Sequence, residues 1–281
     1  MKIVNLFLVG FLFFLYLSIS TTFTSCTKEH TVYDTTFITV HDTTVINECP
    51  YDLKDGLIAY YSFNNGTLLD GSGYNNNIIF NNATKTTDRF GNPNNAYLFD
   101  GMSSYMQVKN SQSLNPNRIT MYAIVNVNGF YTGTCGGNDI LSKGSTYEVN
   151  GFYHLYFADF LTACGSAPPI ETHELFSGGY GDNIPQGAQA GVKDATPINK
   201  GQWYYIVYTY DGQIAKLYVN GELKSALQKK VTFTANTQDL FIAKHENPPY
   251  PYYFNGVIDE IRIYNKALTP DAIHYLVNLK N

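Results

Sequence analysis

The chain has 281 residues, a formal net charge of −5, a charged content of only 15% and 24 tyrosines. It has no cluster of Lys or Arg, which excludes the electrostatic footprint that nucleic-acid-binding proteins need. Once an N-terminal address and a linker are set aside, roughly 225–230 residues remain, and this length fits one large β domain.

The N-terminal 25 residues have the pattern of a secretory signal. Lys2 is positive, and the run from Ile3 to Ile19 is apolar, as in the n- and h-regions of such signals. The small residues that follow lead to Cys26 and resemble a bacterial lipobox, although Phe23 stands where leucine is usual. The pattern predicts that residues 1–25 are removed and that Cys26 carries a lipid. The alternative is an uncleaved anchor, since about 17 apolar residues nearly span a bilayer.

Residues 26–49 are predicted to be a linker. Thr31-Val-Tyr-Asp-Thr-Thr36 recurs as Thr39-Val-His-Asp-Thr-Thr44. This Thr-rich repeat has no second apolar face and cannot bury a core by itself, so we interpret it as a stalk. Its Asp-Thr-Thr triplets also resemble an O-glycosylation acceptor of Bacteroidota. With the lipobox, that resemblance implies a bacterial lipoprotein of the cell envelope, anchored by its lipid to the outer membrane.

Three further cysteines follow Cys26. An exported protein is in a compartment that permits disulfides, and Cys135 and Cys164 flank a predicted pair of strands. We therefore predict a disulfide between these two, which leaves Cys49 unpaired. No two cysteines have the Cys-x-x-Cys spacing, so a zinc or redox site has little support.

From residue 50 to residue 281 the pattern is that of one β domain. Apolar and aromatic runs bounded by Gly, Asn, Asp and Pro predict strands. A hairpin is expected across Asp100-Gly101, a short strand near Leu175, and irregular structure over most of residues 159–200. The predicted strands are Leu57–Phe63, Ala96–Phe99, Tyr105–Val108, Thr120–Val127, Asn138–Lys143, Gly151–Phe157, Val231–Phe233, Leu240–Ala243 and Phe254–Tyr264.

A three-stranded meander is the clearest element. Asp211-Gly212 and Asn220-Gly221 separate three β-prone runs between residues 203 and 225, and such dipeptides suit type I′ turns. Alternation places Leu217 and Val219 on one face and Lys216 and Tyr218 on the other. At the C-terminus, Thr269 and Pro270 predict the N-cap and first turn of a helix that ends near Leu279.

Four motifs, in order, resemble the laminin-G-like, concanavalin-A-like jelly roll. They are Gly56–Phe63 with the loop Asp70–Asn76, Ala96–Gly101 with Tyr105–Val108, Trp203–Gly221, and Phe254–Pro270. The resemblance implies an all-β sandwich of two antiparallel sheets with a short C-terminal helix.

Sugar-cleaving relatives of this fold carry a pair of carboxylates on one strand, in the pattern Glu-x-Asp-x-x-Glu. This sequence has no such run. Asp259 and Glu260 are adjacent, so in a regular strand they point to opposite faces and cannot act together. The sequence therefore predicts a protein that is not an enzyme.

A structural calcium site is one candidate. The Asp70–Asn76 loop offers oxygen ligands of the kind that Ca²⁺ prefers, with Asp70 and Asn75 as its donors. In jelly rolls of this kind an early loop meets the closing strand, so Asp259 completes the predicted set. The alternative is that Asp70 and Asn75 only form Asx turns and that Asp259 only pins a loop.

Sugar recognition needs aromatic faces beside polar side chains. The candidates are Tyr250, Tyr252 and Tyr253 in a Pro-rich loop, with Tyr153 and Tyr180 nearer the irregular region. The alternative is that these tyrosines fill the sheets.

The favoured function is non-catalytic binding of a carbohydrate or glycoconjugate by an envelope lipoprotein. A protein–protein or adhesion module is the first alternative, with a host or envelope surface protein as partner. A hydrolase with an unrecognised site is the second. No nucleic-acid partner is expected, and contact with the membrane is expected only through the lipid.

Overall fold

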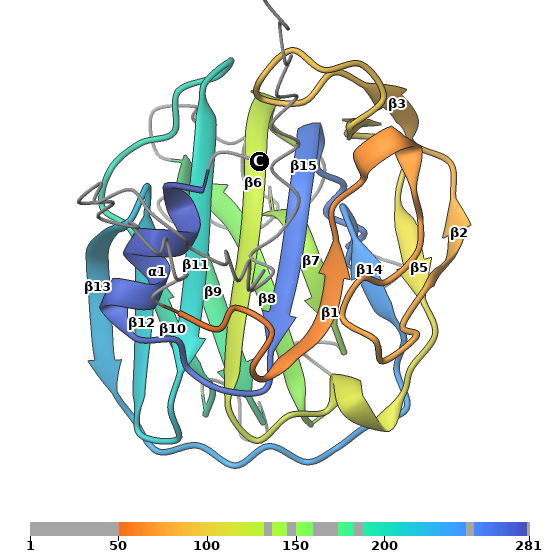
Figure 1. Ribbon diagram of the computed structural model, residues 1–281. Coiled ribbons are helices and arrows are strands. Elements are labelled where there is room, and N and C mark those ends of the chain that lie inside the picture. The colour runs from red at the N-terminus through yellow and green to blue at the C-terminus, as the bar shows by residue number, and fades with distance from the viewer. Residues whose placement is uncertain are drawn as a thin grey trace, which may run out of the picture. The chain divides into compact units, whose positions relative to one another are not determined.

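The computed structural model describes residues 51–131, 137–144, 150–159, 174–182, 188–245 and 250–279, and residues 51–279 belong to one compact unit. The strands of this unit form two antiparallel sheets, seen as two layers in Figure 1. The front sheet has the order β13 (Glu222–Gln228), β12 (Ile214–Val219), β11 (Trp203–Tyr210), β6 (Ile119–Gly129), β15 (Asn255–Tyr264), β4 (Ala96–Asp100) and β3 (Thr84–Thr86), and β1 (Leu57–Tyr61) also pairs with β15.

The back sheet has the order β10 (Ala190–Lys193), β9 (Glu174–Gly181), β8 (Phe152–Asp159), β7 (Gly137–Lys143), β14 (Leu240–Ile242), β5 (Met106–Val108) and β2 (Ile78–Asn81). Two short 3₁₀ turns, Asn64–Gly66 and Gln112–Leu114, and the helix α1 (Pro270–Val277) complete the described elements. The prediction of a two-sheet jelly-roll sandwich with a short C-terminal helix is confirmed.

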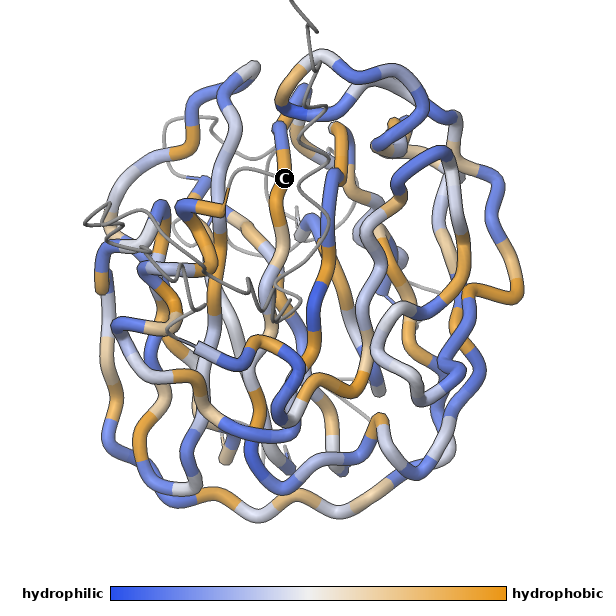
Figure 2. Tube along the Cα trace, in the orientation of Figure 1, coloured by the Kyte–Doolittle hydropathy of each residue, from blue (hydrophilic) through white to orange (hydrophobic). Residues whose placement is uncertain are grey.

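The main core lies between the two sheets. Hydrophilic and hydrophobic residues follow one another along the strands in Figure 2, as the period of two requires. In β12, Leu217 and Val219 enter the core between the sheets, whereas Tyr218 faces the opposite side, as predicted. Asn220 and Gly221 have φ values of 53° and 83°, which the tight turn after β12 requires.

A second apolar layer covers the outer face of the front sheet. Ile273 and Leu276 of α1 are buried against Tyr122, Val207 and Tyr218 of the sheet, and α1 lies across this sheet in Figure 1. The helix begins where the sequence predicts, because the Thr269 hydroxyl accepts a hydrogen bond from the Ala272 N–H at 3.2 Å and proline follows the cap. No helix among the described residues is long and apolar enough to cross a bilayer.

The predicted hairpin across Asp100-Gly101 is wrong. β4 belongs to the front sheet and β5 to the back sheet, so this segment carries the chain from one layer to the other. The Asp100 carboxylate accepts the backbone N–H groups of Met102, Ser103 and Ser104 at 2.8–2.9 Å, and these bonds stabilise the crossing. The same bonds hold the pKa of Asp100 well below its usual value, against the opposing effect of burial.

Other elements also differ from the prediction. Residues 231–233 form no strand, and β2, β3 and β10 were not predicted. The expected short strand near Leu175 extends over eight residues as β9. Residues 1–50 and all four cysteines lie outside the described residues, so the signal peptide, the lipid on Cys26 and the disulfide between Cys135 and Cys164 stay predictions.

Candidate functional site

One row of outward-facing positions crosses all seven strands of the back sheet. Each member lies opposite the next across a strand pair: Gly191, Gly179, His154, Ser142, Phe241, Gln107 and Phe80. Their neighbours along the strands, such as Leu141 and Leu155, are in the core between the sheets, so this row faces away from the core. With strands about 4.8 Å apart, the row is roughly 29 Å long. We call it the cross-strand row.

One end of the cross-strand row is aromatic. Phe80 stacks on Tyr105 with ring centroids 4.7 Å apart, and Tyr105 lies 6.0 Å from Phe241. The Lys244 ammonium lies 4.4 Å from the Tyr105 centroid and 4.8 Å from that of Phe241, within the range of cation–π attraction. Phe80 is 40% exposed. We call Phe80, Tyr105, Phe241 and Lys244 the aromatic end.

Tyr253, one of the predicted ligand-binding residues, lies beside this end. It forms a β-bridge with Asp139 of β7. The pKa of its hydroxyl is raised by burial first, and then by Tyr105, Tyr131 and Asp100. These neighbours place the Tyr253 phenol next to the aromatic end.

Tyr250 and Tyr252 lie close to each other, with stacked rings 6.1 Å apart. Tyr252 is 9% exposed and packs on Gly137, where an added Cβ would lie 2.9 Å from its ring. Tyr252 is therefore mainly a packing residue, whereas Tyr250 and Tyr253 are only half-buried.

The prediction that Tyr153 and Tyr180 face a ligand is wrong. Both side chains are fully buried in the core between the sheets. Their hydroxyls donate to the carbonyl oxygens of Leu114 and Pro116, at 3.2 and 2.7 Å, and burial raises the pKa of both. Each tyrosine is next to an outward-facing residue of its own strand, so its side chain points into the core.

The middle of the cross-strand row is polar and uncharged. Burial lowers the pKa of His154 to about 3 and that of His245, its close neighbour, to about 4, so both imidazoles are neutral at neutral pH. Burial also raises the pKa of Asp139 well above its usual value. His154 Nε2, His245 Nδ1 and Asp139 Oδ2 are buried and make no hydrogen bond. This part of the sheet is therefore polar, without a formal charge, and buried.

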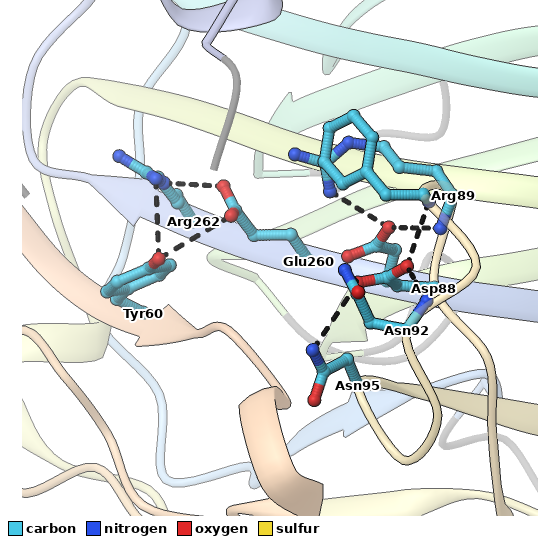
Figure 3. Close-up of polar contacts among 9 residues, drawn as sticks. Tyr60, Asp88, Arg89, Asn92, Asn95, Glu260 and Arg262 are labelled. Atoms are coloured by element: carbon cyan, nitrogen blue, oxygen red, sulfur yellow. Dashed lines mark hydrogen bonds and ion pairs between the residues drawn. The ribbon is translucent and has the colours of Figure 1, made fainter. Parts of the chain in front are cut away.

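The outer face of the front sheet carries a different set of side chains, shown in Figure 3. The Arg262 Nε donates to Glu260 at 2.7 Å, and its guanidinium lies 4.4 Å from the Tyr60 ring centroid. In the loop before β4, the Arg89 guanidinium pairs with Asp259 at 2.8 Å. Each acidic side chain thus has an arginine partner, and all four charged side chains are buried.

The prediction that Asp259 and Glu260 point to opposite faces is wrong, because β15 is not regular there. Its pairing with β6 shifts register between Ile258 and Glu260, and both Ile258 and Ile261 enter the core. The two acidic residues between them therefore share the outer face as a β-bulge. The signal in the sequence was the spacing of the flanking apolar residues: Ile258 and Ile261 are three positions apart, which a strand with a period of two does not give. Both are held in ion pairs, so this arrangement does not supply a free general acid and a free base.

The Asp70 carboxylate accepts hydrogen bonds from its own loop and from the neighbouring strand β1. Asp70 Oδ1 accepts the N–H groups of Tyr60 and Ser72, both at 2.9 Å, and Oδ2 accepts the Ser72 hydroxyl and the Asn76 N–H. Asn75 is exposed with a φ of 60°. These are the contacts of the Asx-turn alternative.

No contact joins Asp70, Asn75 and Asp259, so the structure does not bring the predicted calcium ligands together. Asp259 is engaged by Arg89, which was missed in the sequence and belongs to a different loop. Among the described residues no group of three His, Cys, Asp or Glu side chains is placed to hold a metal ion. Calcium binding stays a prediction.

Comparison with solved structures finds the same fold in several other proteins. Domain 4 of AbnA, a GH43 extracellular arabinanase from Geobacillus stearothermophilus, solved in complex with arabinotriose, is 20% identical with a TM-score of 0.57, and the match covers 79% of this chain and 98% of that one. The binding domain of Paraclostridial Mosquitocidal Protein 1 is 15% identical with a TM-score of 0.60, covering 81% and 53%. The binding domain of botulinum neurotoxin DC, in complex with SialylT, is 13% identical with a TM-score of 0.59, covering 81% and 52%.

This chain spans about half the length of the toxin domains, and identities this low show a shared fold only. No curated protein sequence matches the chain significantly. The profile of the Laminin_G_3 family, described as the concanavalin A-like lectin/glucanases superfamily, matches residues 99–274, which is more than half of the chain. The protein therefore belongs to the concanavalin A-like lectin/glucanase superfamily.

Proposed function

We propose that this domain binds carbohydrate without cleaving it, and that the cross-strand row is its binding face. The observation that carries the proposal is the composition of this row. Stacked aromatic rings at one end are continuous with uncharged polar side chains in the middle and with two glycines, Gly179 and Gly191, at the other end.

The chemistry of sugars matches this composition. The C–H faces of a sugar ring pack against aromatic side chains, and its hydroxyls both donate and accept hydrogen bonds. Phe80 and Tyr105 supply ring faces, and the half-buried Gln107, next to Phe80 in the row, supplies a polar amide. The relative that was solved with arabinotriose and the one solved with SialylT support the same class of ligand.

The proposal of binding without cleavage rests on the carboxylates. Asp259 and Glu260 share a face but are each paired with an arginine. On the back sheet Asp139 lies opposite Tyr156, whereas Asp159 and Glu174 lie opposite each other and are both buried. A hydrolase of the two-carboxylate type needs both an acid and a base or nucleophile across the scissile bond.

We further propose that the domain acts at the cell envelope as a lipoprotein. The support is the N-terminal pattern that ends at Cys26. Replacement of Cys26 by Ser is expected to move the protein from the membrane fraction to the soluble fraction and to remove the lipid from the intact mass. A C26S protein that stays in the membrane with the N-terminal segment uncleaved would support the anchor alternative instead.

The test of carbohydrate binding uses a polysaccharide panel in affinity electrophoresis, followed by calorimetry on each glycan that is retained. Tyr105→Ala and Phe80→Ala are expected to weaken binding about tenfold each, because each removes an apolar contact of roughly 1.5–3 kcal/mol. Tyr74→Ala is the matched control, since Tyr74 is 53% exposed in the Asp70 loop. The proposal fails if no glycan is retained, or if the aromatic-end variants bind like the control.

An adhesion module is the second candidate. Ile79 is 59% exposed and Phe80 is 40% exposed on the edge strand β2, and an apolar edge strand is a surface on which another protein can add a strand. Crosslinking and pull-down from envelope extracts with Ile79→Lys as the comparison discriminates the two functions. Loss of a protein partner in this variant, with glycan binding unchanged, favours adhesion.

A further inference from the structure

A separate pocket of about 200 Å³ lies at the opposite edge of the sandwich from the aromatic end. At this edge β10, the last strand of the back sheet, contacts β12 and β13 of the front sheet. The floor of the pocket is apolar and comes from both sheets. Phe176 of β9 meets Tyr204 of β11 with ring centroids 5.0 Å apart, and Val219 and Ile198 complete it.

The rim of the pocket is polar. Three side-chain amides lie on it, those of Asn199, Gln202 and Asn220, together with the ion pair of Lys224 and Glu222 at 2.8 Å. Amides offer donors and acceptors side by side. The Asn199 backbone N–H donates to the Tyr204 hydroxyl at 2.8 Å. This bond attaches the rim at Asn199 to Tyr204 of the floor.

Asp194 is the side chain that points to a ligand. It lines the pocket and is only 4% exposed. Its Oδ1 accepts the N–H groups of Ala195 and Thr196, at 2.6 and 3.1 Å, whereas Oδ2 accepts no hydrogen bond. The loop thus holds the carboxylate in place through Oδ1, and Oδ2 has no protein donor among the described residues at the wall of the pocket.

We propose that this pocket binds one neutral sugar ring, such as a monosaccharide or the terminal unit of a glycan. Its volume is below the roughly 300–1,000 Å³ of sites for drug-sized molecules, and one ring fits it. A ring hydroxyl donates to the open oxygen of Asp194, neighbouring hydroxyls bond to the rim amides, and the apolar face of the ring packs on Tyr204 and Val219. The pocket is independent of the cross-strand row, since no residue is common to the two.

The experiment titrates the whole protein with neutral monosaccharides (glucose, galactose, mannose, N-acetylglucosamine, arabinose and xylose) at millimolar concentration, by calorimetry and saturation-transfer NMR. We expect one of them to bind with a single site. Asp194→Asn keeps the Oδ1 that holds the loop and replaces the open oxygen, and it is expected to weaken binding about tenfold. Gln202→Ala, at an exposed position, is expected to weaken it without any effect on folding.

Tyr105→Ala separates this proposal from the proposed function. It is expected to leave monosaccharide binding unchanged even where it abolishes polysaccharide binding. The proposal is overturned if no monosaccharide binds, if binding survives both D194N and Q202A, or if Tyr105→Ala removes it. A primary amine that binds in place of the sugars would also overturn it.

Discussion

Arg89 binds Asp259 twice, through its backbone N–H at 3.0 Å and its guanidinium at 2.8 Å, and both bonds end on the same carboxylate oxygen. Asp259 lies where β15 exchanges one partner for another, since residues 255–258 pair with β4 and residues 261–264 pair with β1. The ion pair therefore attaches the loop before β4 to the junction of three strands.

Removal of the Arg89 side chain is expected to be strongly destabilising. Both side chains are about 95% buried, so Arg89→Met leaves a buried carboxylate without its partner, at a cost of about 3–5 kcal/mol in the free energy of unfolding. Urea denaturation measures it. The double variant R89M/D259L is expected to recover most of the loss. Lys109→Ala, whose side chain is 73% exposed beside Asp239, is the control and is expected to cost less than about 1 kcal/mol.

Mild acid is expected to destabilise the domain through two histidines. His154 and His245 have folded pKa values of about 3 and about 4, whereas an unfolded histidine titrates near 6.5. Below pH 6.5 the unfolded chain thus binds more protons than the folded one, and stability falls as pH falls toward 4. The slope is at most about 1.4 kcal/mol per pH unit for each histidine.

The matched measurement compares unfolding free energies of the wild type and of H154Q/H245Q from pH 7.5 to pH 4.5, a window set by the two pKa shifts. The double variant is expected to have a flatter profile. Asp182 and Asp239 have lowered pKa values because they accept hydrogen bonds, so their contribution is lost only at lower pH. An unchanged slope in the variant would contradict the assignment to the histidines.

Gly178 is expected to tolerate no side chain. A Cβ there would lie 2.4 Å from the ring of Tyr208, which is fully buried and donates to the Ala190 carbonyl at 2.6 Å. Gly178→Ala is therefore expected to cost about 1–3 kcal/mol through overpacking. Gly191→Ala is the control on the next strand, because its Cβ would meet only one atom, at 3.9 Å. Equal melting temperatures for the two variants would rule out this account of Gly178.

The Asp70 loop allows a direct test of calcium. Asp70→Ala removes four hydrogen bonds and is expected to lower the free energy of unfolding by about 1–3 kcal/mol. If the loop also holds Ca²⁺, a chelator lowers the melting temperature of the wild type and leaves that of the variant unchanged. A wild-type melting temperature that is the same with chelator and with excess Ca²⁺ removes the predicted site.

Local patterns in this sequence were sufficient for the elements with strong signals. Asn220-Gly221 predicted its turn because few other residues adopt two positive φ values in succession. Thr269-Pro270 predicted the start of α1 for a similarly local reason. The strand β9 was underestimated because Gly178 and Gly179 have low strand propensity. They are there to make room for Tyr208 and His154 from other strands.

The candidate site depended on information that no single stretch contains. The cross-strand row is defined by the register of seven strands that are distant in sequence, so alternation alone could not tell which tyrosine is inward. Tyr153 and Tyr180 were misassigned for this reason, and Arg89 was missed because its partner is 170 positions away. The bulge at Asp259 was detectable, since Ile258 and Ile261 break the period of two.

The first described residue of the domain lies on the opposite side of the sandwich from the cross-strand row. Tyr51, the first described residue, packs on Tyr275 of α1 at 5.7 Å, over the outer face of the front sheet. The cross-strand row occupies the outer face of the other sheet, on the far side of the sandwich. A ligand bound at the aromatic end would therefore lie on the face of the sandwich opposite Tyr51.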